Sequence, residues 1–360
     1  MTDAPLMKPV AGGEEPSVWV EPIRSAQLAL QGGAPAAIQA ALAELVATQE
    51  AHRGTLGRGV RLVPLYRSLL HWTLTGEFLP CNTQIQGARL QLWHLESQWP
   101  ALEYQKAFLA HTIASYGQQR GFRMFERIYA AVDGEKLSDF FDDEDQEFQI
   151  HRRPGATTTI IGFSGLNQRY AGFGWNSFDR TISHKLNANL IVIRDFQKRL
   201  YLAGIESVGR YPETVAYLKA TLAEFAGTRV IATGGSGGVF GALNLAGDLG
   251  IGHAVCMAGP TSLELGEDNS DRQVYQLIAN EAEAGLYDKP QLAEKVKASA
   301  LKRIDFFVAG GKAFDYAQMR NLAEKCTQVV PHVYEDWTDH IVTDLAVADG
   351  SLLAAFGTPV

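Results

Sequence analysis

The sequence predicts an α/β protein in which a mostly parallel sheet, covered by helices, follows an all-helical N-terminal domain. From about residue 150 onward, short β-rich runs alternate with amphipathic stretches, as in parallel sheets with helical crossovers. From 23 to 134 the apolar residues recur with helical spacing instead. A glycine-rich turn at Gly234–Gly238 joins a β-rich run directly to a helical pattern. Such turns lie at the carboxyl edge of a parallel sheet, where α/β proteins place their active sites.

Length and composition narrow the classes of function. The chain has 360 residues, 46% of them apolar, which is enough for two unequal domains with a sizeable core. The formal net charge is -8 and there is no basic stripe, so nucleic acid is not an expected partner. The three cysteines are far apart and form no CxxC pair, which argues against a zinc site and a disulfide framework. We expect neither a metal nor an organic cofactor.

The N-terminal part divides into an arm, a helical domain and a linker. Residues 1–22 are rich in Gly, Pro and Glu and predict a flexible arm without a secretory signal. Residues 23–134 form the helical domain, which either packs on the following domain or binds a protein partner or a second copy. Residues 135–149 are dense in carboxylates and predict a solvated acidic linker. The predicted helices lie near 35–51, 64–75, 84–99 and 102–132, and Gly117 and Gly121 favour a break within the last of these.

The remaining residues, 150–360, form the predicted sheet domain. Amphipathic stretches separate its strands. No run of about 18 apolar residues is present to span a bilayer, so we expect a cytoplasmic protein with no membrane span. The predicted strands are Thr157–Phe163, Leu190–Ile193, Arg229–Ala232, His253–Met257, Asp305–Val308 and Gln328–Tyr334.

The strongest local signal surrounds Ser236. It lies within Gly234-Gly235-Ser236-Gly237-Gly238, which fits the G-x-S-x-G pattern of a nucleophile elbow. Small neighbours are needed there because the serine sits on a sharp, strained turn between a strand and a helix. Valine at Gly235 or Gly237 is therefore expected to clash and to reduce activity or folding.

Three other interpretations of this turn compete with the elbow. Phe240 stands where the dinucleotide pattern G-x-G-x-x-G requires its last glycine. The Gly-Lys-Ser/Thr of a phosphate loop is absent from the sequence. A purely structural glycine-rich turn is the remaining alternative.

Two downstream residues complete a catalytic order of Ser, Asp and His. Asp315 follows the predicted strand Asp305–Val308, and His340 is the only histidine that follows the last predicted strand. A serine hydroxyl needs a base to accept its proton and an acid to orient that base. Ser236, His340 and Asp315 fit these roles, while Asp336 and Asp339 compete with Asp315 for the acid role.

The predicted oxyanion hole combines two backbone N–H groups. One comes from Gly237, the residue after the nucleophile. The second follows the first core strand, where Leu166 is the preferred donor and Gly165 the alternative.

Together the elbow and the ordered triad resemble the α/β-hydrolase superfamily over residues 150–360. The usual His-Gly after the oxyanion strand is replaced by Ser164-Gly165. More loosely, Ile193–Ile205, GGSGG and AGPTSLELG are similar to hydrolase-fold proteins of glycan pathways, such as the O-acetyltransferase component of accessory Sec systems. The resemblance implies an α/β-hydrolase fold and a serine-based acyl transfer.

The expected function is acyl transfer through an acyl-serine intermediate. The substrate would be a small-molecule or glycan acyl compound, with water as acceptor in an esterase or thioesterase. Two alternatives stay open: O-acyl transfer to a glycan hydroxyl, and a non-catalytic scaffold that keeps the fold.

A cap over Ser236 is predicted from the long interval 261–302, which exceeds one helix with short loops. The opposite wall of the substrate pocket would consist of Tyr170, Phe173 and Trp175. The alternative is a helical pair that packs on the sheet away from the site.

Overall fold

The computed structural model divides the chain into two compact units. The first comprises Met1–Leu95 and Ala101–Phe122, and the second comprises Glu96–Pro100 and Arg123–Val360. Three predicted segments lie largely outside the described residues. They are the arm, of which only residues 20–22 are described, the helix 84–99, of which only Leu92 is described, and much of the acidic linker. The residues described are 20–52, 63–79, 92, 102–131, 140, 142–143, 146–266 and 272–359.

The described part of the first unit is helical. The helices predicted near 35–51 and 64–75 are confirmed, whereas the first helix, which extends into the predicted arm, was not predicted. In the second helix Ile38, Ala41 and Leu45 are buried at helical spacing and form its core face. The helices are α1 (Val20–Gly32), α2 (Pro35–Ala51), α3 (Val63–Thr75) and α5 (Leu102–Tyr116).

The predicted stretch 102–132 is two helices rather than one. Its first part, α5, ends before Gly117, whose φ of 72° only glycine adopts readily. The second part is α6 (Arg120–Ala131), which belongs to the second unit from Arg123 onward. A helix that the sequence groups with the N-terminal helices is therefore part of the unit that contains the sheet.

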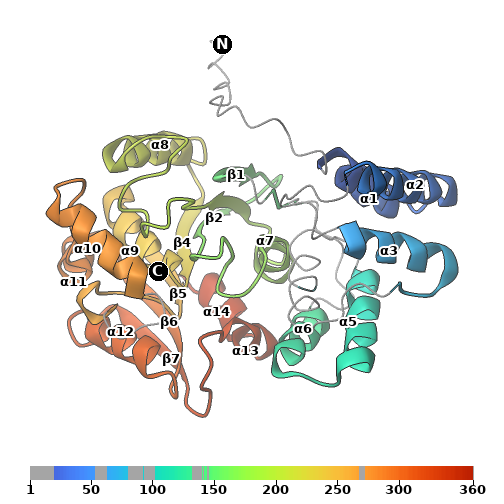
Figure 1. Ribbon diagram of the computed structural model, residues 1–360. Coiled ribbons are helices and arrows are strands. Elements are labelled where there is room, and N and C mark those ends of the chain that lie inside the picture. The colour runs from blue at the N-terminus through green and yellow to red at the C-terminus, as the bar shows by residue number, and fades with distance from the viewer. Residues whose placement is uncertain are drawn as a thin grey trace, which may run out of the picture. The chain divides into compact units, whose positions relative to one another are not determined.

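The second unit contains a seven-stranded sheet of the α/β-hydrolase type, in the order β1-β3-β2-β4-β5-β6-β7 (Figure 1). Strand β1 is antiparallel to β3, and every other neighbouring pair is parallel. The six predicted strands are confirmed, and β1 was not predicted. The strands are β1 (Phe148–His151), β2 (Thr158–Phe163), β3 (Asn189–Ile193), β4 (Arg229–Gly235), β5 (His253–Met257), β6 (Arg303–Ala309) and β7 (Val329–Tyr334).

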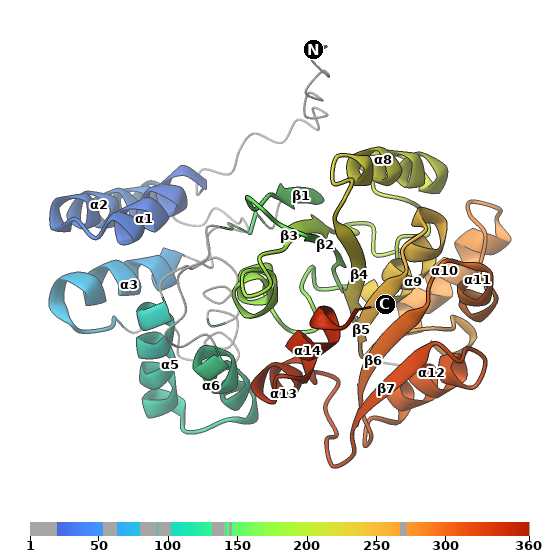
Figure 2. The same cartoon turned by 180° about the vertical axis from the view of Figure 1, so that it is seen from behind.

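Helices cover both faces of the sheet, as the two opposite views show (Figures 1 and 2). One face carries α8 (Tyr211–Ala223), α9 (Gly238–Leu249), α10 (Arg272–Glu283), α11 (Leu292–Ala298) and α12 (Ala313–Ala323), with η3 (Glu264–Gly266) before α10. The other face carries α7 (Trp175–Phe178), η2 (Asp179–Ser183), α13 (Thr343–Ala348) and α14 (Ser351–Gly357).

Burial on both faces explains the composition of the central strands. Every residue of β3 and β5 is buried, which matches their nearly continuous apolar runs. The parallel arrangement then brings the loops after β2, β4, β6 and β7 to one edge of the sheet. The candidate catalytic residues Ser236, Asp315 and His340 follow β4, β6 and β7 at this edge.

Candidate active site

Ser236 occupies a strained turn between β4 and α9. Its φ of 53° lies in the left-handed region that side chains other than glycine rarely adopt. The N–H of Ser236 donates to the carbonyl of Met257 at 2.9 Å, and the carbonyl of Ser236 accepts from the N–H of Val239 at 3.0 Å. Such backbone strain costs about 1–3 kcal/mol and persists only where the surroundings impose it. Strand, strained serine and helix follow one another as in a nucleophile elbow.

The glycines that flank Ser236 differ in how closely they are packed. A Cβ at Gly235 would lie 2.4 Å from the backbone nitrogen of Ala171, which cannot move without shifting its loop. A Cβ at Gly237 would meet only side chains, the nearest being Leu200 Cδ2 at 3.0 Å. Glycine is thus required by a backbone contact at Gly235, whereas Gly237 leaves its neighbours some room to adjust.

A histidine–carboxylate pair forms where the loops after β6 and β7 meet. Nδ1 of His340 lies 2.8 Å from Oδ2 of Asp315. Asp315 is fully buried in the first turn of α12, while the His340 side chain is 34% exposed. In a neutral ring that donates its Nδ1 proton to the carboxylate, Nε2 carries no proton and is the nitrogen that can act as a base. The pair therefore has the geometry of a base and its orienting acid.

The turn Ala171–Gly172 brings the His340 loop next to the elbow. Its first residue contacts Gly235, the residue that precedes Ser236, as described above. A Cβ at its second residue would lie 2.8 Å from Cδ1 of Ile341, the residue that follows His340. Ser236 and His340 are thus carried by segments that pack against the same turn.

The competing acids have other surroundings. Oδ1 of Asp339 accepts the N–H of Ile341 at 3.4 Å, within its own loop. Asp336 is exposed. Among the three candidate acids, Asp315 is the one whose carboxylate lies 2.8 Å from the ring of His340.

The loop after β2 lies against the elbow. A Cβ at Gly237 would lie 3.1 Å from Cγ of Leu166, and a Cβ at Gly165 would lie 3.1 Å from Cβ of Ser236. The N–H of Gly165 donates to the carbonyl of Arg169 at 2.8 Å. The N–H of Gly165 is therefore already used within its own loop.

The predicted wall residues Tyr170, Phe173 and Trp175 are all fully buried. Tyr170 OH lies 2.7 Å from Thr233 Oγ1, and Trp175 Nε1 donates to Ser164 Oγ at 2.9 Å. The three aromatic residues therefore present no surface to a substrate in this structure and support the site from behind. The hydroxyl of Ser164, at the position where the superfamily pattern has histidine, is the acceptor for Trp175.

A strained loop after β3 was not anticipated from the sequence. Lys198, Leu200 and Tyr201 have φ values of 56°, 53° and 66°. Oδ2 of Asp195 accepts the N–H of Arg199 at 2.6 Å and that of Tyr201 at 3.0 Å, which fixes the loop. Since Leu200 lies against Gly237, this loop shapes the wall beside the elbow.

The interval 261–302 divides into two parts with different surroundings. In α11, Lys295 Nζ donates to Oδ1 of Asn244 in α9 at 2.7 Å, so this helix packs on the sheet-covering layer. In α10, Glu281 pairs with Arg199 at 2.5 Å through Nε and at 2.7 Å through a second nitrogen. This pair joins α10 to the loop beside the elbow, which makes α10 the candidate cap.

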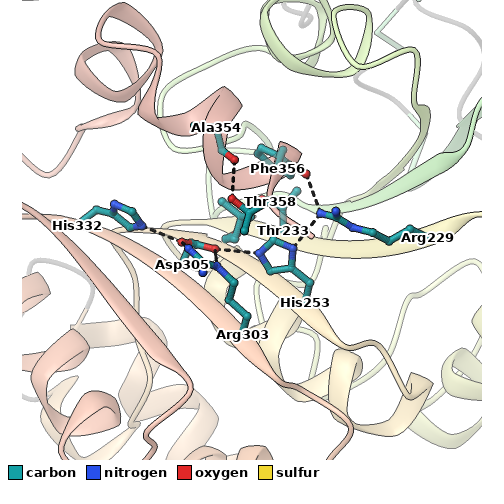
Figure 3. A network of polar contacts seen from close by, with 10 residues as sticks. Arg229, Thr233, His253, Arg303, Asp305, His332, Ala354, Phe356 and Thr358 are labelled. Carbon is teal, nitrogen blue, oxygen red and sulfur yellow. Dashed lines mark hydrogen bonds and ion pairs between the residues drawn. The ribbon is translucent and has the colours of Figure 1, made fainter. Parts of the chain in front are cut away.

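A second polar cluster crosses the other end of the sheet (Figure 3). Asp305 is fully buried and accepts hydrogen bonds from His253 at 2.9 Å, His332 at 2.8 Å and Arg303 at 2.7 Å. Burial alone would raise the pKa of Asp305, but these donors outweigh it and hold that pKa well below its usual range. Arg229 joins the cluster to the C-terminal helix by donating to the Phe356 carbonyl at 2.7 Å.

This second cluster differs from the His340–Asp315 pair in position. His253 begins β5, so it lies at the amino end of a strand rather than at the edge where Ser236 emerges. Its carboxylate partner is within a strand and saturated with donors. The cluster therefore joins strands β4 to β7 and clamps α14, which is a stabilising arrangement.

Within the described ranges, no group of three or more His, Cys, Asp or Glu residues is arranged to hold a metal ion. Among the helices that the structure describes, none has the length and apolar character needed to cross a membrane.

Comparisons with known proteins find similarity at the level of fold. No family model matches the chain, and no curated protein matches it in sequence. Three similar solved structures are the capsule O-acetyltransferase of Neisseria meningitidis serogroup A (13% identity, 63% of this chain and 98% of that chain, TM-score 0.44), esterase B from Lactobacillus rhamnosis (15%, 69% and 96%, TM-score 0.40) and an S-formylglutathione hydrolase from Agrobacterium tumefaciens (13%, 60% and 93%, TM-score 0.42).

Proposed function

We propose that this chain is a serine-dependent acyl hydrolase or acyltransferase with Ser236 as nucleophile. The observation that carries the proposal is the 2.8 Å contact between His340 and Asp315, on a loop that shares a packing partner with the Ser236 elbow. A strained serine, a histidine and a buried carboxylate supply the three roles of nucleophilic acyl transfer.

In the proposed mechanism, Ser236 Oγ attacks the acyl carbonyl while Nε2 of His340 accepts the hydroxyl proton. The negative charge on the tetrahedral oxygen is stabilised by the N–H groups of Gly237 and Leu166, each worth about 3 kcal/mol. His340 then protonates the departing alcohol or thiol. The resulting acyl-serine is resolved by water, or by an acceptor hydroxyl, which His340 deprotonates in turn.

Asp315 holds the ring of His340 in the tautomer that leaves Nε2 unprotonated, and stabilises the imidazolium that forms. Its burial favours this role, because a carboxylate removed from water interacts more strongly with the developing charge. Substrate choice falls to the walls beside the elbow, where α10 and the Leu200 loop are joined by the Glu281–Arg199 pair.

The test is direct detection of the acyl-enzyme. The 360-residue chain is mixed with p-nitrophenyl acetate and quenched in acid, and its intact mass and the mass of its Ser236 peptide are measured. An acetyl group on Ser236, absent from Ser236→Ala, supports the proposal. The share of the acetyl group that is transferred to water, or to added alcohols or sugars, then distinguishes a hydrolase from an acyltransferase. Release of p-nitrophenol at equal rates from both proteins, with no adduct, would refute it and favour a scaffold.

A further inference from the structure

The loop between β7 and α13, which carries His340, is held by a helix that lies outside the sheet. Nε of Arg127, in α6, donates to Oδ2 of Asp344 at 2.6 Å, and a second guanidinium nitrogen contacts the same oxygen. The guanidinium carbon of Arg127 also lies 5.4 Å from the ring centroid of Trp337. Trp337 precedes His340 in the chain and Asp344 follows it. The side chain of Arg127 therefore contacts the loop on both sides of the proposed base.

Trp337 also forms hydrogen bonds with the backbone near His340 and Asp315. Trp337 Nε1 donates to the carbonyl of Ile341 at 2.8 Å, which closes the loop around the histidine. The carbonyl of Trp337 accepts the N–H of Gly311 at 2.9 Å, in the segment that leads to Asp315. Trp337 is therefore linked through its ring to Ile341, next to His340, and through its backbone carbonyl to the segment that leads to Asp315.

Asp344 gives the contact its strength. Its side chain is 1% exposed, while that of Arg127 is 28% exposed. Burial raises the pKa of Asp344, and the charge and hydrogen bond of Arg127 counteract that rise. Removing the guanidinium would leave a buried carboxyl without its counter-charge at the first turn of α13, directly after the histidine loop.

We infer that Arg127 is a positioning residue for His340, acting through Trp337 and Asp344. The inference rests on the proposed function, because it assigns Arg127 a role in orienting the proposed base. Through Arg127, α6 would therefore influence the rate of the proposed reaction. Arg127 itself touches no reacting atom, so its effect is transmitted by the placement of the loop.

The experiment measures the rate of Ser236 labelling by a fluorophosphonate in Arg127→Gln and in the full-length parent. We expect a loss of about 10- to 100-fold, as a small displacement of a base produces. Arg123→Gln is the matched control, because Arg123 lies one turn earlier on α6 and is exposed. Arg127→Lys retains the charge without the planar fork and should fall between the two.

A cycle with His340→Ala separates positioning from general stability. If Arg127 acts through His340, Arg127→Gln should slow labelling in the parent but cause no further loss in the His340→Ala background. An equal loss in both backgrounds would overturn the inference. The double variant Arg127→Gln/Asp344→Asn removes the uncompensated buried charge, so its melting temperature should recover while its labelling stays slow. Recovery of both would show a purely structural role.

The two proposals fail differently. If the parent is labelled at Ser236 and His340→Ala is slow, but Arg127→Gln matches the parent, the inference about Arg127 alone is wrong. If the folded parent is not labelled, or His340→Ala labels as fast as the parent, the proposed function is wrong and the positioning role is overturned with it.

Discussion

Oδ2 of Asp315 lies 2.8 Å from Nδ1 of His340, although the two residues follow different strands and are separated by the rest of α12 and the whole of β7. Parallel strand order explains the meeting, because β6 and β7 are neighbours and both end at the same edge. The buried carboxylate and the partly exposed ring differ in access to water, as an orienting acid and a proton-transferring base require.

Asp315→Asn should reduce the rate of acyl-enzyme formation by about 10³- to 10⁴-fold, because an amide can stabilise the wrong tautomer of His340. The matched control is Asp336→Asn, which removes an exposed carboxylate from the His340 loop. Pre-steady-state release of p-nitrophenol provides the measurement. Equal losses in the two variants would exclude Asp315 as the specific orienting acid.

Gly235→Ala should lower the free energy of unfolding more than Gly237→Ala does, although the sequence predicts clashes for valine at both positions. The added methyl at Gly235 meets the backbone nitrogen of Ala171, whereas at Gly237 it meets the end of the Leu200 side chain. We expect overpacking of about 1–3 kcal/mol or more at Gly235 and a smaller loss at Gly237. Urea denaturation of the two variants checks this order, and the reverse order would contradict the described elbow.

Asp305→Asn should lower the free energy of unfolding near neutral pH by about 3–5 kcal/mol, because it breaks a buried charged cluster. The folded-state pKa of Asp305 lies below its unfolded value, so its ionised form adds stability above pH about 4. That contribution is lost as the pH falls toward the folded-state pKa. Denaturation at several pH values should therefore show that the difference in unfolding free energy between parent and variant becomes smaller below pH 4. A gap that stays constant would show that ionised Asp305 does not stabilise the fold.

Glu281→Gln should alter acyl-chain preference while leaving labelling of Ser236 intact. The substitution weakens the pair with Arg199 that holds α10 beside the Leu200 loop. Rates with p-nitrophenyl esters from acetate to decanoate measure the preference, and Glu294→Gln on α11 is the control. Glu294 pairs with Lys297 on its own helix. An unchanged profile would mean that α10 does not act as a cap.

Much of the sheet domain could be predicted because its signals are local. Runs such as those of β3 and β5 are almost entirely apolar, as is typical of parallel strands buried on both faces. The order of Ser236, Asp315 and His340 follows from the order of the strands, so their loops could be assigned to one edge from the sequence alone.

Other features depend on contacts between distant segments. The periodicity of α6 predicts a helix but not the unit on which it packs, so the Arg127–Asp344 pair leaves no pattern in the sequence. Likewise Asp305 looks like an ordinary strand residue until β5 and β7 place His253 and His332 beside it. Strand β1 was missed because Glu147 and its neighbours are too acidic to suggest a strand.

The aromatic residues show a different limit. Tyr170, Phe173 and Trp175 follow the oxyanion strand and suggest a substrate wall, but Gly162 leaves space for the Trp175 ring against β2. A Cβ at Gly162 would lie 2.4 Å from that ring. A missing side chain on one strand thus makes room for the buried ring of Trp175, and sequence spacing cannot show it.

The most direct measurement of the central claim is fluorophosphonate labelling of the full-length protein, followed by peptide mapping. The account predicts one modified residue, Ser236, with labelling abolished in Ser236→Ala and slowed in His340→Ala. Labelling that persists in a folded Ser236→Ala protein, or a folded parent that does not react, would contradict it.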